Sequence, residues 1–128
     1  MPHSYLKKSQ DTYDSGEVLR KEKKFNSSIH CYYYSCIQLC NHFFNIKEGL
    51  TDSQIRDLFK TNESHKDTIK KLISLLGRGS HKAFTTDLSI LKDNRVKADY
   101  RNFSLGEADS EESKDLCDNV VSQLKKAL

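Results

Sequence analysis

Three residues close together near the end of one expected helix, Arg95, Asp99 and Tyr100, carry the side chains best suited to chemistry. Arg95 falls in a stripe that recurs at helical spacing in segment 80–103: Phe84, Leu88, Leu91, Arg95 and Ala98. Because a guanidinium keeps its charge, one that faces a core needs a carboxylate, an anion or a water-lined cavity. We therefore expect an inward-facing cation beside an acid and a phenol, suited to orienting or holding a phosphate.

Two structural explanations compete with that functional one. A long arginine stem often lies along apolar surface while its charged head reaches water. Arg95 also suits a pairing with a core acid that only fixes the register of the helices. Asp99 and Tyr100 favour function, because they lie on the adjacent turn and are placed to orient the guanidinium or a bound phosphate.

The cysteines and histidines invite a metal hypothesis that their spacing does not favour. Cys36 and Cys40 stand at i and i+4, and His30 and His42 are close by, but the CxxC pairs typical of structural zinc are absent. We expect Cys36 and Cys40 to be small buried apolar residues, with no metal and no cofactor.

The aromatic run Tyr32-Tyr33-Tyr34 covers most of a helix circumference, so at least one ring is expected to face a cleft or a second subunit. We favour packing for these rings over stacking on a nucleobase.

The glycine-rich segment 77–80 lacks the Gly-Lys-Ser/Thr ending of a phosphate loop and is interpreted as a hinge. No sequence signature of a catalytic triad is present.

The elements that must position these residues are all helical, since no alternating strand pattern occurs and breakers are few. We expect helices over these ranges: 4–24, 25–45, 51–59, 64–76, 81–100 and from 109 or 110 to 127. Range 25–45 has the widest apolar stripe and is the expected central helix. Thr51 with Gln54 resembles a capping box, and Asp109 or Ser110 is the expected cap of the last helix. Small residues at Ser9 and Gly16 predict a close approach between the first helix and a neighbour.

Composition sets the broad class. A chain of 128 residues with 36% hydrophobic and 30% charged residues suits a single helical domain, residues 1–128, with charged outer faces. A net charge of +3 permits a nucleic-acid partner without requiring one. No signal-peptide core or membrane-length apolar stretch occurs, so we expect a cytoplasmic protein without membrane contact, its cysteines as thiols.

Two segments resemble motifs of one family. The string Leu88-x-x-Leu91-x-x-x-Arg95-x-x-Ala98-Asp99-Tyr100 looks like the penultimate helix of HEPN domains, which are helical bundles of prokaryotic defence and toxin–antitoxin systems. The stretch from Phe25 to Ser35, with its Tyr run, resembles their core helix. The order of the two segments and the final amphipathic helix also match. The resemblance implies an antiparallel four- or five-helix bundle that forms a homodimer with two arginine motifs across a shared cleft.

The resemblance also implies a function. Active HEPN proteins are metal-independent endoribonucleases in which an arginine, here Arg95, holds the scissile phosphate. A histidine that follows after four to six intervening residues moves a proton. Here that histidine is missing, because positions 100 to 102 are Tyr100, Arg101 and Asn102. Arg95, Asp99 and Tyr100 are the candidate catalytic residues, and His30 and His81 are the histidines to inspect for completion of the site.

Two functions therefore stay open. The first is binding of RNA or nucleotide around Arg95 in a toxin–antitoxin or defence system, with or without ribonuclease activity. The second is a non-catalytic module in which Arg95, Asp99 and Tyr100 organise the dimer or dock a nucleotidyltransferase-type antitoxin. A weaker third is an unrelated helical scaffold in which Arg95 only extends to water.

Overall fold

Every regular element that the computed structural model describes is an α-helix, and the part of the chain it describes holds no strand. The described residues are 4–47, 49–57, 82–100 and 104–127, with the backbone alone at 4, 82–85 and 127. The helices are α1 (Ser4–Lys21), α2 (Phe25–Lys47), α3 (Asp52–Asp57), α5 (Lys82–Tyr100) and α6 (Glu107–Ala127). The expected helix 64–76, the hinge at 77–80 and His81 lie outside the described residues.

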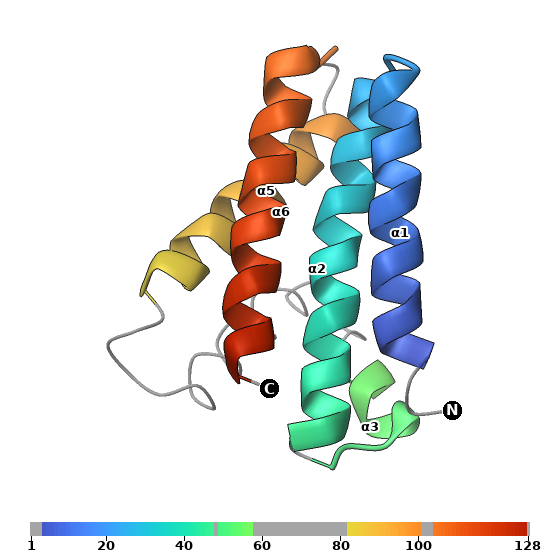
Figure 1. Cartoon of the computed structure of the whole chain (residues 1–128), viewed down its shortest axis with the longest axis vertical. Helices are drawn as coiled ribbons and strands as arrows, with labels where there is room; N and C mark the ends of the chain where they lie inside the picture. Colours follow the sequence, from blue (N-terminus) through green and yellow to red (C-terminus); the bar gives the residue numbers. More distant parts are fainter. Residues whose placement is uncertain (1–3, 48, 58–81, 101–103, 128) are drawn as a thin grey trace.

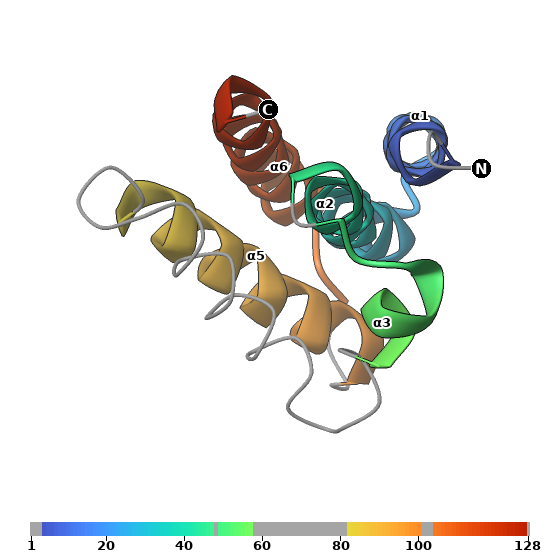
Figure 2. The same cartoon turned by 90° about the horizontal axis from the view of Figure 1, so that it is seen from below.

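Helix α2 is the centre of the bundle, as its wide apolar stripe predicts. It packs against α1, α5 and α6, and more briefly against α3 (Figures 1 and 2). Helices α1 and α5 ascend while α2 and α6 descend in the view of Figure 1. The all-α prediction is confirmed, and α5 crosses the other helices at a marked angle (Figure 2).

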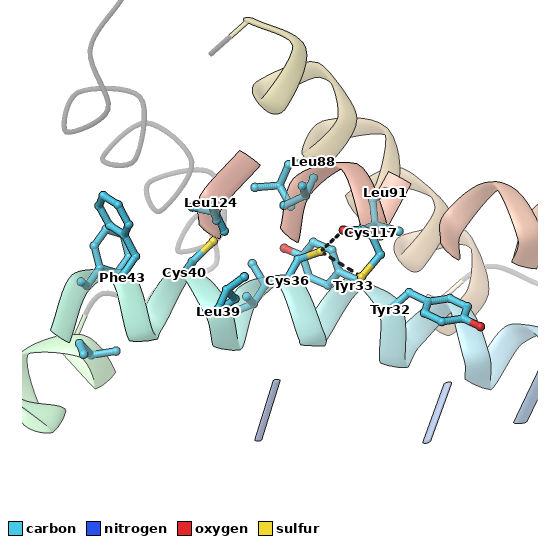
Figure 3. Packing of buried hydrophobic residues seen from close by; sticks show 14 residues of the cluster. Tyr32, Tyr33, Cys36, Leu39, Cys40, Phe43, Leu88, Leu91, Cys117 and Leu124 are labelled. Atoms are coloured by element: carbon cyan, nitrogen blue, oxygen red, sulfur yellow. Dashed lines mark hydrogen bonds between the residues drawn. The ribbon is translucent and has the colours of Figure 1, made fainter. Parts of the chain in front are cut away.

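The core lies where α2, α5 and α6 meet. Its buried members include Tyr33, Cys36, Cys40, Leu88, Leu91, Cys117, Val120 and Leu124. Figure 3 labels most of these side chains, which converge between the helices. Each recurs on its helix at three- or four-residue steps, which places it on the face turned toward α2 or the neighbouring helix.

Helix α1 approaches α2 closely because small residues line the contact. A Cβ atom added at Gly16 would lie 3.0 Å from Tyr32 Cε1 and 3.2 Å from the Cys31 Cβ. Ser9 Oγ donates a hydrogen bond to the Ser35 carbonyl at 2.8 Å, and Ser35 Oγ donates to the Ser9 carbonyl at 2.7 Å. The close approach predicted from Ser9 and Gly16 is therefore confirmed.

Three hydrogen-bonded polar side chains lie where α1 ends against the start of α2. The Tyr32 hydroxyl donates to Glu17 Oε1 at 2.7 Å, and Arg20 lies 3.2 Å from the other carboxylate oxygen. Burial acts to raise the pKa of Glu17, but the hydrogen bonds from Tyr32 and Arg20 outweigh it and lower this pKa overall.

The lowered pKa of Glu17 has a measurable consequence. A carboxyl whose pKa falls on folding contributes stability above its unfolded pKa, and that contribution is lost as the pH falls through the folded value. We therefore expect the free energy of unfolding of wild type to exceed that of Glu17→Gln by less at about pH 3 than at about pH 7. Urea titrations at both pH values measure this. An advantage of wild type that is the same at both pH values would contradict the prediction.

The end of α1 has a Schellman geometry formed without glycine. The Lys24 N–H donates to the Leu19 carbonyl at 2.8 Å and the Lys23 N–H to the Arg20 carbonyl at 3.0 Å. Lys23 itself takes a φ of 63°, in the left-handed region that favours glycine. Helix α1 thus ends at Lys21, three residues before the end expected from sequence.

We expect Lys23→Gly to stabilise the protein by about 1 kcal/mol, since glycine removes the steric cost of a left-handed residue. Chemical denaturation measures the change. Lys21→Gly is the matched control, because Lys21 lies within α1 and should lose about 0.5–1 kcal/mol instead. Destabilisation by both substitutions would contradict the assignment.

Two helix starts were predicted with different success. The capping box before α3 is present: Thr51 N–H donates to Gln54 Oε1 at 2.9 Å, and Gln54 N–H donates to Thr51 Oγ1 at 3.2 Å. The expected start of α6 at Asp109 or Ser110 is wrong, because the helix begins at Glu107 and Asp109 Oδ2 instead accepts the Gly106 N–H at 2.9 Å. Ser110 faces inward and shares a 2.6 Å hydrogen bond with Ser28 of α2.

Candidate functional site

Arg95 is buried, as the stripe on its helix predicts. Arg95 is 5% exposed, and Leu88 and Leu91 on the preceding turns of α5 are fully buried. The side chain of Phe84, the first member of the expected stripe, lies outside the described residues. Arg95 thus continues the apolar face of α5 into the region where α5 crosses the start of α2.

Aromatic rings and one carboxylate surround the guanidinium. Its central carbon lies 5.0 Å from the ring centre of Tyr33, 5.2 Å from that of Tyr34 and 5.4 Å from that of Tyr100. Arg95 Nη2 donates to the Tyr34 hydroxyl at 3.2 Å, and Nε lies 3.9 Å from Asp99 Oδ2. Such contacts stabilise a cation that has lost most of its water. The guanidinium of Arg95 therefore contacts side chains of its own chain.

Asp99 joins Arg95 to a histidine from another helix. His30 Nδ1 lies 2.7 Å from Asp99 Oδ2, across 69 residues of sequence. The His30 side chain is 48% exposed and the Asp99 side chain 19%, so the pair lies at the edge of the bundle. The ring of His30 also lies 4.6 Å from the ring centre of Tyr34. His30 therefore stands one contact away from Arg95, at a position where solvent reaches it.

Tyr100, the phenol expected beside Arg95, does not face inward with it. Tyr100 is 72% exposed, although the centre of its ring lies 5.4 Å from the guanidinium carbon. The reason is geometric: five residues further along an α-helix, a side chain is turned by about 140° from Arg95. The exposed ring is available to a ligand or a partner.

A shallow pocket of about 250 Å³ adjoins the His30–Asp99 pair. It is lined by residues of α1, α2 and α5: Leu19, Asn26, Ser27, His30, Cys31, Ala98 and Asp99. Burial, and then the nearby Asp99 carboxylate, raise the pKa of Cys31, so this cysteine is present as a thiol. The group with acid–base capacity at the pocket is therefore the histidine–aspartate pair.

Asn26 fixes the wall of this pocket and was missed by the sequence analysis. Its Nδ2 donates to the Ala98 carbonyl at 3.1 Å, and its Oδ1 accepts the Leu105 N–H at 2.9 Å. One amide at the start of α2 thus holds the chain on both sides of residues 101–103. Nothing in its local spacing distinguishes it from any polar residue in a first helical turn.

The other candidate constellations are packed in the core. Cys36 Sγ lies 3.5 Å from Cys117 Sγ and 4.0 Å from the Cys117 carbonyl oxygen (Figure 3), and burial raises the pKa of Cys40 to about 12. Cys36 and Cys40 therefore pack as small apolar residues, as expected. Among residues 4–47, 49–57, 82–100 and 104–127, no three His, Cys, Asp or Glu side chains converge as a metal site would require.

The tyrosine run divides between the core and the contacts around Arg95. Tyr32 and Tyr33 are fully buried, whereas Tyr34 is partly exposed between Arg95 and His30. Packing is thus the main use of these rings, with Tyr34 serving the site.

Of the described helices, none combines the length and the apolar character needed to cross a membrane.

Comparison with models of known protein families, with curated proteins and with solved structures finds no match for this chain.

Proposed function

We propose that this protein binds RNA at the pocket beside His30 and Asp99 and cleaves it without a metal ion, as a HEPN-like ribonuclease of a toxin–antitoxin or defence system. The observation that carries the proposal is the 2.7 Å contact between His30 Nδ1 and Asp99 Oδ2 beside the buried Arg95. It supplies, from a different helix, the type of residue that is missing after Arg95.

The pair suits proton transfer from a ribose hydroxyl. An imidazole that donates its Nδ1–H to Asp99 keeps the lone pair on Nε2 for use as a base. His30 Nε2 accepts the proton of a 2′-hydroxyl, whose oxygen attacks the adjacent phosphorus and displaces the 5′-oxygen. The products are a 2′,3′-cyclic phosphate and a 5′-hydroxyl end, and a proton returns to the leaving oxygen.

Arg95 and Tyr100 have different parts in this proposal. Arg95 is a positioning residue, because its guanidinium lies against Asp99 and the ring of Tyr34 on which His30 rests. Tyr100, 72% exposed, offers a ring on which a base can stack. In the homodimer that the HEPN resemblance implies, the second copy brings another such site to a shared cleft.

The test is cleavage of a single-stranded RNA by purified protein in excess EDTA. We expect fragments that end in a 2′,3′-cyclic phosphate, and no cleavage of the same sequence made with 2′-deoxyribose, because the attacking hydroxyl is then absent. Cleavage that requires added Mg²⁺, or products with a 5′-phosphate, would overturn the proposed chemistry.

The burial of Arg95 favours a second function, that of a non-catalytic module for dimerisation or for docking a partner. A guanidinium that is 5% exposed and already contacts three tyrosine rings and Asp99 is also what a purely structural network requires. In that case the exposed Tyr100 is a contact in a dimer or in the docking of a nucleotidyltransferase-type antitoxin. Absence of RNA binding and cleavage, together with loss of the dimer in Tyr100→Ala, would decide for this second function.

A further inference from the structure

A second pocket, of about 240 Å³, lies between α1 and α6 on the other side of the bundle from His30. Its floor on α2 includes Leu39, which is turned by about 180° from His30 along that helix. Its walls are the inner edges of α1 and α6, which flank α2 in Figure 2. The lining residues are Leu6, Ser9, Gln10, Tyr13, Ser35, Leu39, Asp118, Val121 and Lys125.

The pocket has the dimensions of a small elongated molecule. Leu6 to Tyr13 on α1 and Asp118 to Lys125 on α6 each cover eight residues, and the seven rises between their ends amount to about 10 Å of helix. Because α1 and α6 run in opposite directions, Tyr13 and Asp118 meet at one end, where the Tyr13 hydroxyl donates to Asp118 Oδ1 at 2.8 Å. Leu6 and Lys125 stand at the other end.

The lining between the two ends of the pocket leaves few hydrogen-bonding groups for a ligand to satisfy. The hydroxyls of Ser9 and Ser35 already donate to each other's backbone carbonyls across the α1–α2 contact. The apolar part of the lining is formed by Leu6, Leu39, Val121 and the ring of Tyr13. An apolar chain fits there without leaving a buried donor unpaired.

The charges select a negatively charged head group. The negative charge of Asp118 is balanced by Lys114, whose Nζ lies 3.0 Å from Asp118 Oδ2. Tyr13 donates a hydrogen bond to the other carboxylate oxygen, Oδ1. Lys125 is exposed, and no carboxylate of the described residues pairs with it. The cation that remains at the pocket is therefore at the end opposite the Tyr13–Asp118 contact.

We propose that this pocket binds a medium-chain carboxylate, with its apolar chain between Leu39, Val121 and Tyr13 and its carboxylate at Lys125. The site is separate from the His30–Asp99 pocket and does not depend on RNA cleavage.

The experiment is an NMR titration of the full chain with sodium octanoate, and with 1-octanol as the uncharged equivalent. We expect saturable shifts of the Leu39 and Val121 methyl signals with a Kd for octanoate below about 1 mM. Lys125→Gln should raise that Kd by about threefold, the effect of one exposed ion pair, while leaving octanol binding unchanged.

Two further variants make the result decisive. Lys126→Gln removes a neighbouring exposed charge that does not line the pocket, so it should leave octanoate binding within about twofold of wild type. Gln10→Trp places a large side chain at the exposed rim and should abolish binding. Non-saturable shifts, equal weakening by both lysine substitutions, or undiminished binding to Gln10→Trp would each overturn the proposal.

Discussion

Replacing His30 by alanine is expected to lower the rate of the proposed RNA cleavage by about 10²–10⁴-fold, the usual contribution of a positioned general base. The imidazole is the half-exposed group of the His30–Asp99 pair, so its loss removes the proton acceptor and leaves the core unchanged. Initial rates on a fixed RNA in EDTA measure the effect, and urea denaturation checks that the free energy of unfolding changes by less than about 1 kcal/mol.

The matched control is His42→Ala, a second histidine on α2 that does not line the His30 pocket. It should retain wild-type cleavage. If His30→Ala and His42→Ala have the same activity, His30 is not the base, and the proposed ribonuclease mechanism fails. If both lose activity in parallel with stability, the effect is on folding and again excludes a catalytic role for His30.

Replacing Arg95 by alanine is expected to destabilise the protein by about 2–4 kcal/mol. The change removes a buried cation from three aromatic rings, leaves Asp99 without one of its two partners, and opens a cavity between α5 and α2. Arg95→Lys should recover only part of the loss, because an ammonium lacks the planar face that packs against the rings. Urea denaturation of both variants measures these differences.

Lys97→Ala is the control for Arg95, since Lys97 is an exposed cation on the same helix and should change the free energy of unfolding by at most about 0.5 kcal/mol. The outcome that would contradict the positioning role is an Arg95→Ala protein of wild-type stability that no longer binds RNA. Arg95 would then contact the phosphate itself, as the HEPN resemblance implies.

The sequence was most informative where periodicity alone decides. The stripe on α2 and the burial of Leu88, Leu91 and Arg95 follow from 3.6 residues per turn, which needs no knowledge of neighbours. The capping box at Thr51 was equally predictable, because both of its hydrogen bonds join residues three apart. Local rules were less reliable at the start of α6, where Gly106, Asp109 and Ser110 offer several possible caps and the inward position of Ser110 depends on Ser28 of α2.

The candidate site divides in the same way. The sequence by itself determined that Arg95 faces the core and that Asp99 is close enough to pair with it, because both lie on one helix. Only the tertiary structure decided that His30 is the partner of Asp99. The physical reason is that the angle at which α5 crosses α2 selects which side chains meet. That angle results from the packing of all the buried side chains between the helices, which no local spacing records.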